Sequence, residues 1–337
     1  MKIAVIGSGA IGSLIAGYLC LKGEDVVLSG RREAVKEINK SGLKISGVRG
    51  SFNIKIRAAE RLDFLADLVI LATKTQDIEP ALDENRQFLG GIDILITQNG
   101  LAAENLVTKY TGAEHIISSI VMFGSTYLNP GEVVHNFEGS WIIGRGVLRS
   151  DARLVEITGV LDKAFAVIVA EDIKGMKYLK VFINANNCIP AILGLSMQEV
   201  FLDKDISRIG ICIWKEGLGL INKTGIRLAS LPGFPLERIT GLCALPLGEA
   251  AKIFSGIMLG LSKEPLYGSV LQSIKRKRPS EIDYINGEFV RIARENNLDA
   301  PLNEKLVEMV HMVEETKRFF SKEELVSATK DFVLQRG

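Results

Sequence analysis

A lysine and an asparagine four residues apart are the first candidates for chemistry in this 337-residue chain. Lys180 and Asn184 lie in residues 176–193, whose apolar spacing predicts a helix, so both side chains project from one face about one turn apart. A lysine at the largely buried start of a helix has its charged form disfavoured, which lowers its pKa from about 10.4 towards the range useful for acid–base work. Lys180 is therefore a candidate proton donor. The alternative is a structural lysine whose ammonium reaches water, the commoner fate of a single lysine.

A carboxylate later in the chain is a second candidate. Residues 280–296 read as a helix, with Ser280 as its N-cap and Asp283 reaching back in a capping box. Glu281 then falls in the first turn. Its structural role there is to complement the helix dipole, worth roughly 0.3–1 kcal/mol, and periodicity alone favours that role. Ser269 is either a hydroxyl in the same chemistry or a simple helix cap.

The elements that must position these groups begin with a strand and a glycine-rich turn. Residues 2–12, KIAVIGSGAIG, place three glycines in G-x-G-x-x-G order directly after an apolar run. In a dinucleotide-binding turn the first glycine permits the turn, the second lets a pyrophosphate approach the backbone, and the third lets the helix pack. The pattern is weak by itself among 33 glycines, but a predicted helix over 13–21 strengthens it. The candidate cofactor-binding residues of the turn are Gly7, Ser8, Gly9, Ala10, Ile11 and Gly12.

The end of the second strand, residues 25–29, indicates which dinucleotide is preferred. It reads Ser29-Gly30-Arg31-Arg32 and has no carboxylate to bind an adenosine ribose. The guanidinium groups of Arg31 and Arg32 instead occupy the position where charge-assisted hydrogen bonds can hold the 2′-phosphate of NADP. NADP is therefore favoured over NAD, and the alternative is that both arginines are solvated loop cations.

Two further polar turns follow short apolar runs. Residues 68–73 and 92–97 are suited to buried parallel strands, and they are followed by Lys74-Thr75-Gln76 and Gln98-Asn99-Gly100. In an open parallel sheet these turns lie at the carboxyl edge beside the cofactor crevice, so their polar residues are candidate ligands. Strands predicted at 116–123, 131–136 and 141–144 complete a sheet domain.

The length of the chain favours two domains. From residue 151 strand signals become scarce, and helices are predicted over 152–165, 176–193, 280–296 and 302–320, with loops at 230–235 and 244–247. We expect an α/β fold. An N-terminal Rossmann-type doubly wound sheet domain, residues 1–170, binds NADP, and an all-helical C-terminal domain, residues 171–337, holds the substrate and catalytic groups.

Composition excludes several functional classes. Lys plus Arg number 41 and Asp plus Glu 40, a balance without general attraction to nucleic acid or an anionic membrane. The four cysteines are far apart and the three histidines fall on separate elements, so neither a disulfide framework nor a metal site is predicted. The chain begins directly with a strand, and no apolar run reaches membrane-spanning length. We expect a cytoplasmic protein.

Together these residues resemble the ketopantoate reductases (2-dehydropantoate 2-reductases), a family within the wider 6-phosphogluconate dehydrogenase-like group. The resemblance runs nearly end to end. The most specific segment is 269–287, SVLQSIKRKRPSEIDYING. The other matching motifs are the glycine turn, Lys74 with Gln76, Gln98-Asn99-Gly100, and Lys180-x-x-x-Asn184.

The resemblance implies NADPH-dependent reduction of the C2 ketone of ketopantoate to pantoate, a step towards pantothenate and coenzyme A. It makes Lys180 the general acid. It makes Glu281 the carboxylate that orients the substrate and the lysine. By position, Asn184 and Ser269 resemble substrate partners, Asn99 resembles the amide that meets cofactor ribose and substrate, and Lys74 and Arg31 resemble NADP contacts.

Three departures from the family pattern bear on the substrate. Cys188 stands where the family often has a second asparagine, residues 196–266 form a longer stretch than in compact members, and the segment around His135 follows the family's glycine-rich pattern only loosely. The alternatives are a reductase of another branched 2-ketoacid or an imine, or a non-catalytic NADP-binding module. The partner expected is a small-molecule 2-ketoacid. The oligomeric state stays open, with a homodimer as one alternative.

Overall fold

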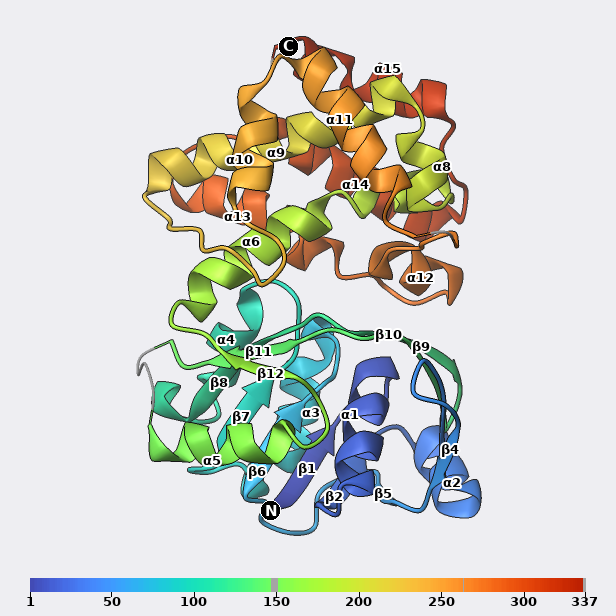
Figure 1. Cartoon of the computed structure of the whole chain (residues 1–337), viewed down its shortest axis with the longest axis vertical. Coiled ribbons are helices and arrows are strands. Elements are labelled where there is room, and N and C mark those ends of the chain that lie inside the picture. The colour runs from blue at the N-terminus through green and yellow to red at the C-terminus, as the bar shows by residue number, and fades with distance from the viewer. Residues whose placement is uncertain (147–150, 263, 336–337) are drawn as a thin grey trace. The chain divides into compact units, whose positions relative to one another are not determined.

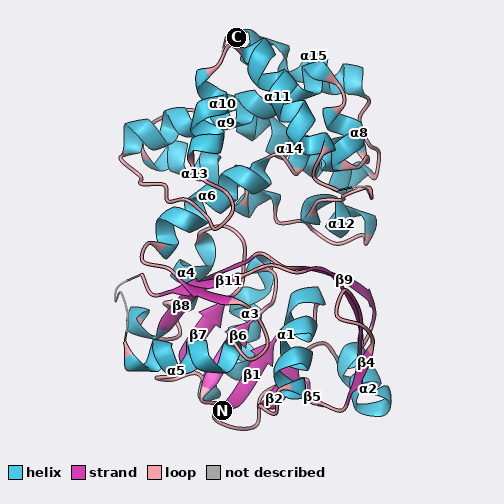
Figure 2. Ribbon diagram, in the orientation of Figure 1, coloured by secondary structure: helices cyan, strands magenta, loops and turns pink. Residues whose placement is uncertain are grey.

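The computed structural model describes residues 1–146, 151–262 and 264–335, and the chain divides into two compact units. The N-terminal unit is Met1–Lys177 and the C-terminal unit is Tyr178–Gly337 (Figure 1). In Figure 2 the strands of the described residues belong to the N-terminal unit, whereas the C-terminal unit is built of helices. The predicted α/β class is confirmed.

An eight-stranded mixed sheet forms the centre of the N-terminal unit. Neighbouring strands are parallel except for the antiparallel pair β8 and β11. In spatial order the strands are β12 (Val167–Val169), β11 (Trp141–Gly144), β8 (Ile116–Val121), β7 (Asp93–Ile96), β6 (Leu68–Leu71), β1 (Lys2–Ile6), β2 (Asp25–Ser29) and β5 (Arg57–Ala59).

Both faces of this sheet are covered, as a doubly wound fold requires. Along β1, Ile3 and Val5 belong to one buried cluster, whereas Ala4 and Ile6 belong to another, because successive side chains in a strand point to opposite faces. The first cluster includes residues of α1 (Ala10–Leu21), α2 (Arg32–Ser41) and α5 (Ala152–Leu161). The second includes residues of α3 (Ile78–Asn85) and α4 (Ala102–Val107).

A second, four-stranded sheet packs beside α1 and was not predicted. Its order is β4 (Phe52–Ile54), β3 (Leu43–Gly47), β10 (Glu132–Phe137) and β9 (Gly124–Asn129). The strand predicted at 131–136 therefore exists, but it does not join the main sheet. A Cβ on Gly17 of α1 would lie 2.5 Å from the Cδ1 atom of Ile45, so this glycine lets the helix approach the second sheet closely.

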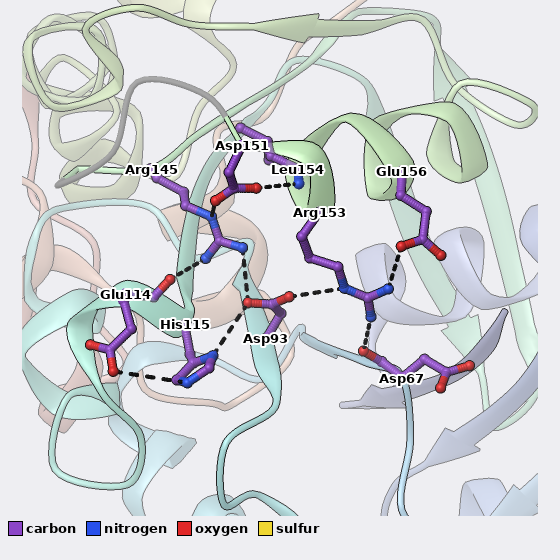
Figure 3. Close-up of polar contacts among 9 residues, drawn as sticks. All are labelled: Asp67, Asp93, Glu114, His115, Arg145, Asp151, Arg153, Leu154 and Glu156. Atoms are coloured by element: carbon purple, nitrogen blue, oxygen red, sulfur yellow. Dashed lines mark hydrogen bonds and ion pairs between the residues drawn. The ribbon is translucent and has the colours of Figure 1, made fainter.

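A network of charges joins strand and helix ends at the amino edge of the main sheet (Figure 3). Asp93 begins β7 and is 8% exposed, and its carboxylate accepts from Arg145 Nη2 at 2.9 Å and Arg153 Nε at 3.2 Å. Arg145 is itself 7% exposed and also pairs with Asp151, the N-cap of α5, at 2.9 Å. Because buried charges are costly unless paired, Asp93 holds β7, the end of β11 and the start of α5 together.

The C-terminal unit is helical, as predicted. Within residues 178–262 and 264–335, the strand-like pairing is limited to one isolated bridge between Leu231 and Phe234. The chain enters this unit along α6 (Ile173–Ala185) and continues through α7 (Cys188–Leu193), α8 (Met197–Phe201), α9 (Lys204–Thr224), α10 (Glu237–Ala244), α11 (Leu247–Leu259), α12 (Ser269–Lys275), α13 (Asn286–Glu295), α14 (Pro301–Thr316) and α15 (Lys322–Leu334).

The single helix predicted over 176–193 is two helices, and Pro190 explains the break. A proline has no backbone N–H and is tolerated only in the first turn of a helix. Pro190 occupies the third position of α7, so α6 ends at Ala185 and a new helix starts at Cys188. The helix predicted over 302–320 also ends earlier, at Thr316, where Lys317 adopts a left-handed φ of 60°.

Candidate active site

The glycine turn after β1 is shaped by contacts that exclude larger side chains. Gly7 has a φ of +118°, and a Cβ there would lie 2.6 Å from the backbone carbon of Ala72. A Cβ on Gly12 would lie 1.9 Å from the carbonyl oxygen of Gly7. Around Gly9, by contrast, a Cβ would meet no heavy atom of the described residues within 4 Å. The turn is therefore tightly packed at Gly7 and Gly12 and open at Gly9.

The open side of the turn coincides with the start of α1. Gly9 is the N-cap, and Ser13 makes the first i→i−4 bond by donating its N–H to the Gly9 carbonyl at 3.0 Å. The amides of Ala10, Ile11 and Gly12 precede that bond, so they belong to the set that a helix cannot satisfy internally. Together with the helix dipole, such amides suit an anionic group.

Two arginines follow β2 at the same carboxyl edge. Arg31 is the N-cap residue of α2, its side chain is 69% exposed, and its Nη2 atom lies 3.5 Å from Asp77 Oδ2. Arg32 is more exposed and lies 4.0 Å from Glu60. The cations that the sequence places at this edge are thus at the surface, with only weak ion pairs to acidic neighbours.

The turns after β6 and β7 meet through Gln98. Its Nε2 donates to the carbonyl oxygens of Leu71 at 3.1 Å and Thr73 at 2.9 Å, which ties the two strand ends together. Gln98 therefore has a structural role. Lys74 and Asn99 are half-buried in these same turns.

Two buried oxygens at this edge lack hydrogen-bond partners among the described residues. They are Oγ1 of Thr73 and Oε1 of Gln98. Buried polar atoms are normally satisfied, so such a pair marks a place where a polar ligand is expected to bind. The open Gly9, the start of α1 and these two oxygens fit a dinucleotide.

In the C-terminal unit, Lys180 and Asn184 lie four residues apart on α6 and are both half-buried. Desolvation by burial lowers the pKa of Lys180 to about 8. At pH 7 this amine is still mostly protonated, and it releases a proton far more readily than an exposed lysine. That combination suits a general acid.

The segment around Glu281 differs from the predicted capping box. The Ser280 Oγ accepts the Ile282 N–H at 3.3 Å, but the Ser280 N–H donates to Glu314 Oε1 of α14 at 2.6 Å, and Asp283 contacts His311 at 3.0 Å instead of reaching back. Residues Ile282–Tyr284 form a 3₁₀ turn, η4, and α13 starts only at Asn286. Glu281 is half-buried immediately before this turn.

Ser269 is the first residue of α12, and its N-cap is Gly268, so Ser269 does not cap the helix. The Ser269 side chain is exposed. A Cβ on Gly268 would lie 2.8 Å from Asn187 Oδ1, which places the start of α12 against the break between α6 and α7. Ser269 therefore lies near the end of the helix that carries Lys180 and Asn184.

Cys188 is fully buried and does not provide a surface contact. Burial raises the pKa of its thiol to about 12, and its Sγ atom lies 3.6 Å from Asn286 Nδ2. Asn286 also donates to Asn303 Oδ1 at 3.0 Å. Position 188, where this chain departs from the family pattern, is therefore part of the packed interior of the C-terminal unit.

Behind Cys188, a buried carboxylate fixes the start of α14. Glu216 of α9 accepts the N–H groups of Leu302 at 3.1 Å and Asn303 at 2.8 Å, and also the Asn303 side chain at 2.9 Å. A carboxylate at a helix N-terminus is stabilised by the dipole. Sequence reasoning missed Glu216. Pro301 marks the start of α14, but no pattern in the sequence connects it to residue 216.

The described part of the chain contains no cluster of three or more His, Cys, Asp or Glu residues suited to a metal ion. Nor is any helix within residues 1–146, 151–262 and 264–335 both long and apolar enough to cross a membrane.

Comparison with known sequences covers both units. The family pattern described as "Ketopantoate reductase PanE/ApbA" matches residues 3–147, and "Ketopantoate reductase PanE/ApbA C terminal" matches residues 172–314. The 2-dehydropantoate 2-reductase of Pyrococcus abyssi is 31% identical over 306 residues, which cover 90% of this chain and 94% of the relative. The enzyme of the same name from Pyrococcus horikoshii is 31% identical over 308 residues, with the same coverage.

Solved structures share the fold at lower identity. A ternary structure of D-mandelate dehydrogenase with NADH and anilino(oxo)acetate has a TM-score of 0.80 at 23% identity, covering 94% of this chain and 99% of the other. The PanE/ApbA family ketopantoate reductase of Ralstonia eutropha JMP134 has a TM-score of 0.79 at 21% identity, with the same coverage.

Proposed function

The chain belongs to the ketopantoate reductase family, and from that premise we propose that it reduces the C2 ketone of 2-dehydropantoate to the alcohol of pantoate with NADPH. It is an oxidoreductase of a family that uses a nicotinamide cofactor. The observation that carries the proposal is Lys180, a half-buried lysine whose lowered pKa suits proton donation, one turn from Asn184 on α6.

The residues of the N-terminal unit account for cofactor binding. Gly9 leaves room for the pyrophosphate, the first amides of α1 donate hydrogen bonds to its oxygens, and the polar residues after β6 and β7, Lys74 and Asn99 among them, contact the rest of the molecule. Bound there, NADPH would supply the hydride for the ketone carbon. Arg31 holds the 2′-phosphate by charge-assisted hydrogen bonds, because a guanidinium matches phosphate geometry.

The residues of the C-terminal unit account for the proton and for the substrate. Lys180 donates its proton to the carbonyl oxygen, which becomes the hydroxyl of the product, so one hydride and one proton convert ketone to alcohol. While still charged, the ammonium also stabilises the negative charge that develops on that oxygen. Asn184 and Ser269 hydrogen-bond the substrate, and Glu281 orients it through its carboxylate.

The function is tested by following the oxidation of NADPH with 2-dehydropantoate and with a panel of other branched 2-ketoacids and imines. We expect the highest kcat/KM for 2-dehydropantoate. Because Cys188 is buried, its presence should not redirect the enzyme to another substrate. A higher kcat/KM for another panel member would refute the substrate, and saturable NADPH binding without any turnover would indicate a non-catalytic module.

Cofactor preference gives a separate prediction at Arg31. We expect Arg31→Ala to weaken NADPH binding by about 10- to 100-fold, the size of one or two charge-assisted hydrogen bonds, and to leave NADH binding nearly unchanged. Fluorescence titration with each cofactor measures both dissociation constants. The matched control is Arg57→Ala, since Arg57 is also a surface arginine paired with an aspartate, Asp63. Equal weakening of NADPH and NADH would show that Arg31 does not recognise the extra phosphate.

A further inference from the structure

The segment that carries Glu281 is attached to α14 on both sides of that residue. On one side, the Ser280 N–H donates to Glu314 Oε1 at 2.6 Å. On the other, Asp283 Oδ1 lies 3.0 Å from His311 Nε2. His311 and Glu314 are three residues apart on α14, so both attachments come from neighbouring positions on one helix.

His311 links the two attachments. Its Nδ1 atom lies 3.2 Å from Glu314 Oε2 while its Nε2 atom contacts Asp283, so the imidazole bridges two carboxylates. A protonated imidazole donates from both nitrogens, whereas a neutral one donates from a single nitrogen and turns a lone pair towards the other carboxylate. The arrangement is therefore complete only when His311 is charged.

We propose that His311 is a positioning residue for Glu281, and that its imidazolium bridge between Asp283 and Glu314 holds the substrate-orienting carboxylate in place. This inference rests on the role proposed above for Glu281. It makes substrate affinity, and not cofactor affinity, depend on the charge of His311, because all the groups involved belong to the C-terminal unit.

The direction of the pH dependence follows from the surroundings of the ring. Partial burial disfavours the charged form, but the hydrogen bonds and charges of Asp283 and Glu314 outweigh it and raise the pKa of His311 above its usual value. The charged groups facing the ring are Asp283 from η4 and Glu314 from α14, while Lys317 donates to the Glu314 carbonyl. The bridge is complete below about pH 6.5 and is lost as the pH rises through the raised pKa.

The first test is the variant His311→Gln, whose side chain cannot carry a charge. We expect the KM for 2-dehydropantoate to rise about tenfold at pH 6.5, as is typical when a reacting group is slightly misplaced, while the dissociation constant of NADPH stays within about twofold. The ratio of the KM of the variant to that of the wild type should fall as the pH rises, because the wild type loses the bridge. Lys180 titrates in both proteins and cancels from this ratio.

Two further variants separate positioning from a general loss of structure. His311→Lys keeps a cation between the two carboxylates, and we expect a KM near the wild-type value that holds to higher pH. His115→Gln replaces a partly exposed histidine of the N-terminal unit and should leave KM unchanged. A KM for His311→Gln within about twofold of the wild type, or a His311→Lys variant as impaired as His311→Gln, overturns the proposal.

A binding measurement tests the same coupling without turnover. The chain has three histidines, so the His311 proton resonance can be assigned by its absence in His311→Gln. If substrate binds more tightly when His311 is charged, bound substrate must raise the pKa of His311 by linkage. We expect an upward shift on adding 2-dehydropantoate with NADP⁺, an unreactive pair, and no shift in Glu281→Gln. An unchanged pKa in the wild type overturns the proposal.

The proposed function and this inference fail in distinguishable ways. If the wild-type protein does not reduce 2-dehydropantoate, the proposed function fails, and hydrogen exchange decides whether the bridge holds the segment. In that case, faster exchange of the Ser280 amide in His311→Gln than in His115→Gln supports the bridge. Equal exchange in the two variants overturns it.

Discussion

Replacing Lys180 with alanine is expected to lower kcat by about 10²- to 10⁴-fold, the usual contribution of a positioned general acid. The dissociation constant of NADPH should stay within about twofold, because the residues proposed to bind it belong to the N-terminal unit. Stopped-flow reduction of 2-dehydropantoate measures the rate, and fluorescence titration measures the affinity. Thermal stability should be unchanged or slightly higher, since the variant no longer desolvates an ammonium.

The matched control for this variant is Lys174→Ala. Lys174 lies on the same helix but is exposed, so its loss should leave kcat within about twofold of the wild type. If Lys180→Ala retains more than about a tenth of the wild-type kcat, Lys180 is not the proton donor. A large loss of NADPH affinity would instead assign Lys180 to cofactor binding.

The pH dependence of the wild-type rate follows from the same lysine. The proton donor must be charged, and burial lowers the pKa of Lys180 to about 8. We therefore expect log kcat, measured at saturating substrate so that the effect of His311 on KM does not enter, to be level below pH 8 and to fall with a slope of about one above it. A profile that stays level to pH 10 would mean either an ordinary exposed lysine or a different acid.

Of the variants proposed here, Asp93→Ala should cause the largest decrease in the free energy of unfolding. Among the described residues, the substitution leaves Arg145, a 7% exposed cation, with the partly exposed Asp151 as its remaining carboxylate partner. Breaking a buried pair by removing one partner costs about 3–5 kcal/mol in the free energy of unfolding. The N-terminal unit should therefore unfold at a much lower urea concentration.

Tryptophan fluorescence can report this unfolding selectively. Trp141 is a fully buried residue of β11, whereas Trp214 lies in the C-terminal unit, so the Trp214→Phe background leaves a reporter of the N-terminal unit. The control is Glu156→Gln, at the exposed rim of the same network, which should change the free energy of unfolding by less than about 1 kcal/mol. Similar losses for the two variants would show that burial of Asp93 does not govern its contribution.

The strands of the main sheet could be predicted from the sequence because each one is marked by the composition of a short stretch of chain. Short apolar runs such as residues 68–73 and 92–97 are buried on both faces, and the turns that follow them are polar, so composition alone marks both strand and edge. The helical character of the C-terminal unit was predicted for a similar reason, since its apolar residues recur at helical spacing.

The second sheet was missed because its pairing is not local. β3 pairs with β10, about 90 residues later in the chain, and β4 has only three residues. Such short, partly exposed strands are stabilised by their neighbours and leave little periodicity to read. The strand predicted at 131–136 exists as β10, but its sequence does not indicate that it belongs to a second sheet.

The surroundings of Glu281 were mispredicted for a related reason. The spacing of Ser280 and Asp283 is that of a capping box, but both residues instead bond to α14, about 30 residues further along the chain. Only the resemblance to the family raised Glu281 above a structural role. The break between α6 and α7, in contrast, was not predicted but could have been, because Pro190 is incompatible with the interior of a helix.

The buried carboxylate of Glu216 fixes the position of α14, so substitutions of Glu216 should affect residues further along that helix. This carboxylate accepts the backbone N–H groups of Leu302 and Asn303 in the first turn of the helix. His311 is eight residues after Asn303, which is about 12 Å along the helix axis at 1.5 Å per residue. A rigid helix transmits a shift at one end to the other. Sequence changes at position 216 in natural populations should therefore appear as enzymes with poor substrate affinity and intact cofactor binding, although Glu216 is buried at the start of α14 and is not among the residues proposed to bind substrate or cofactor.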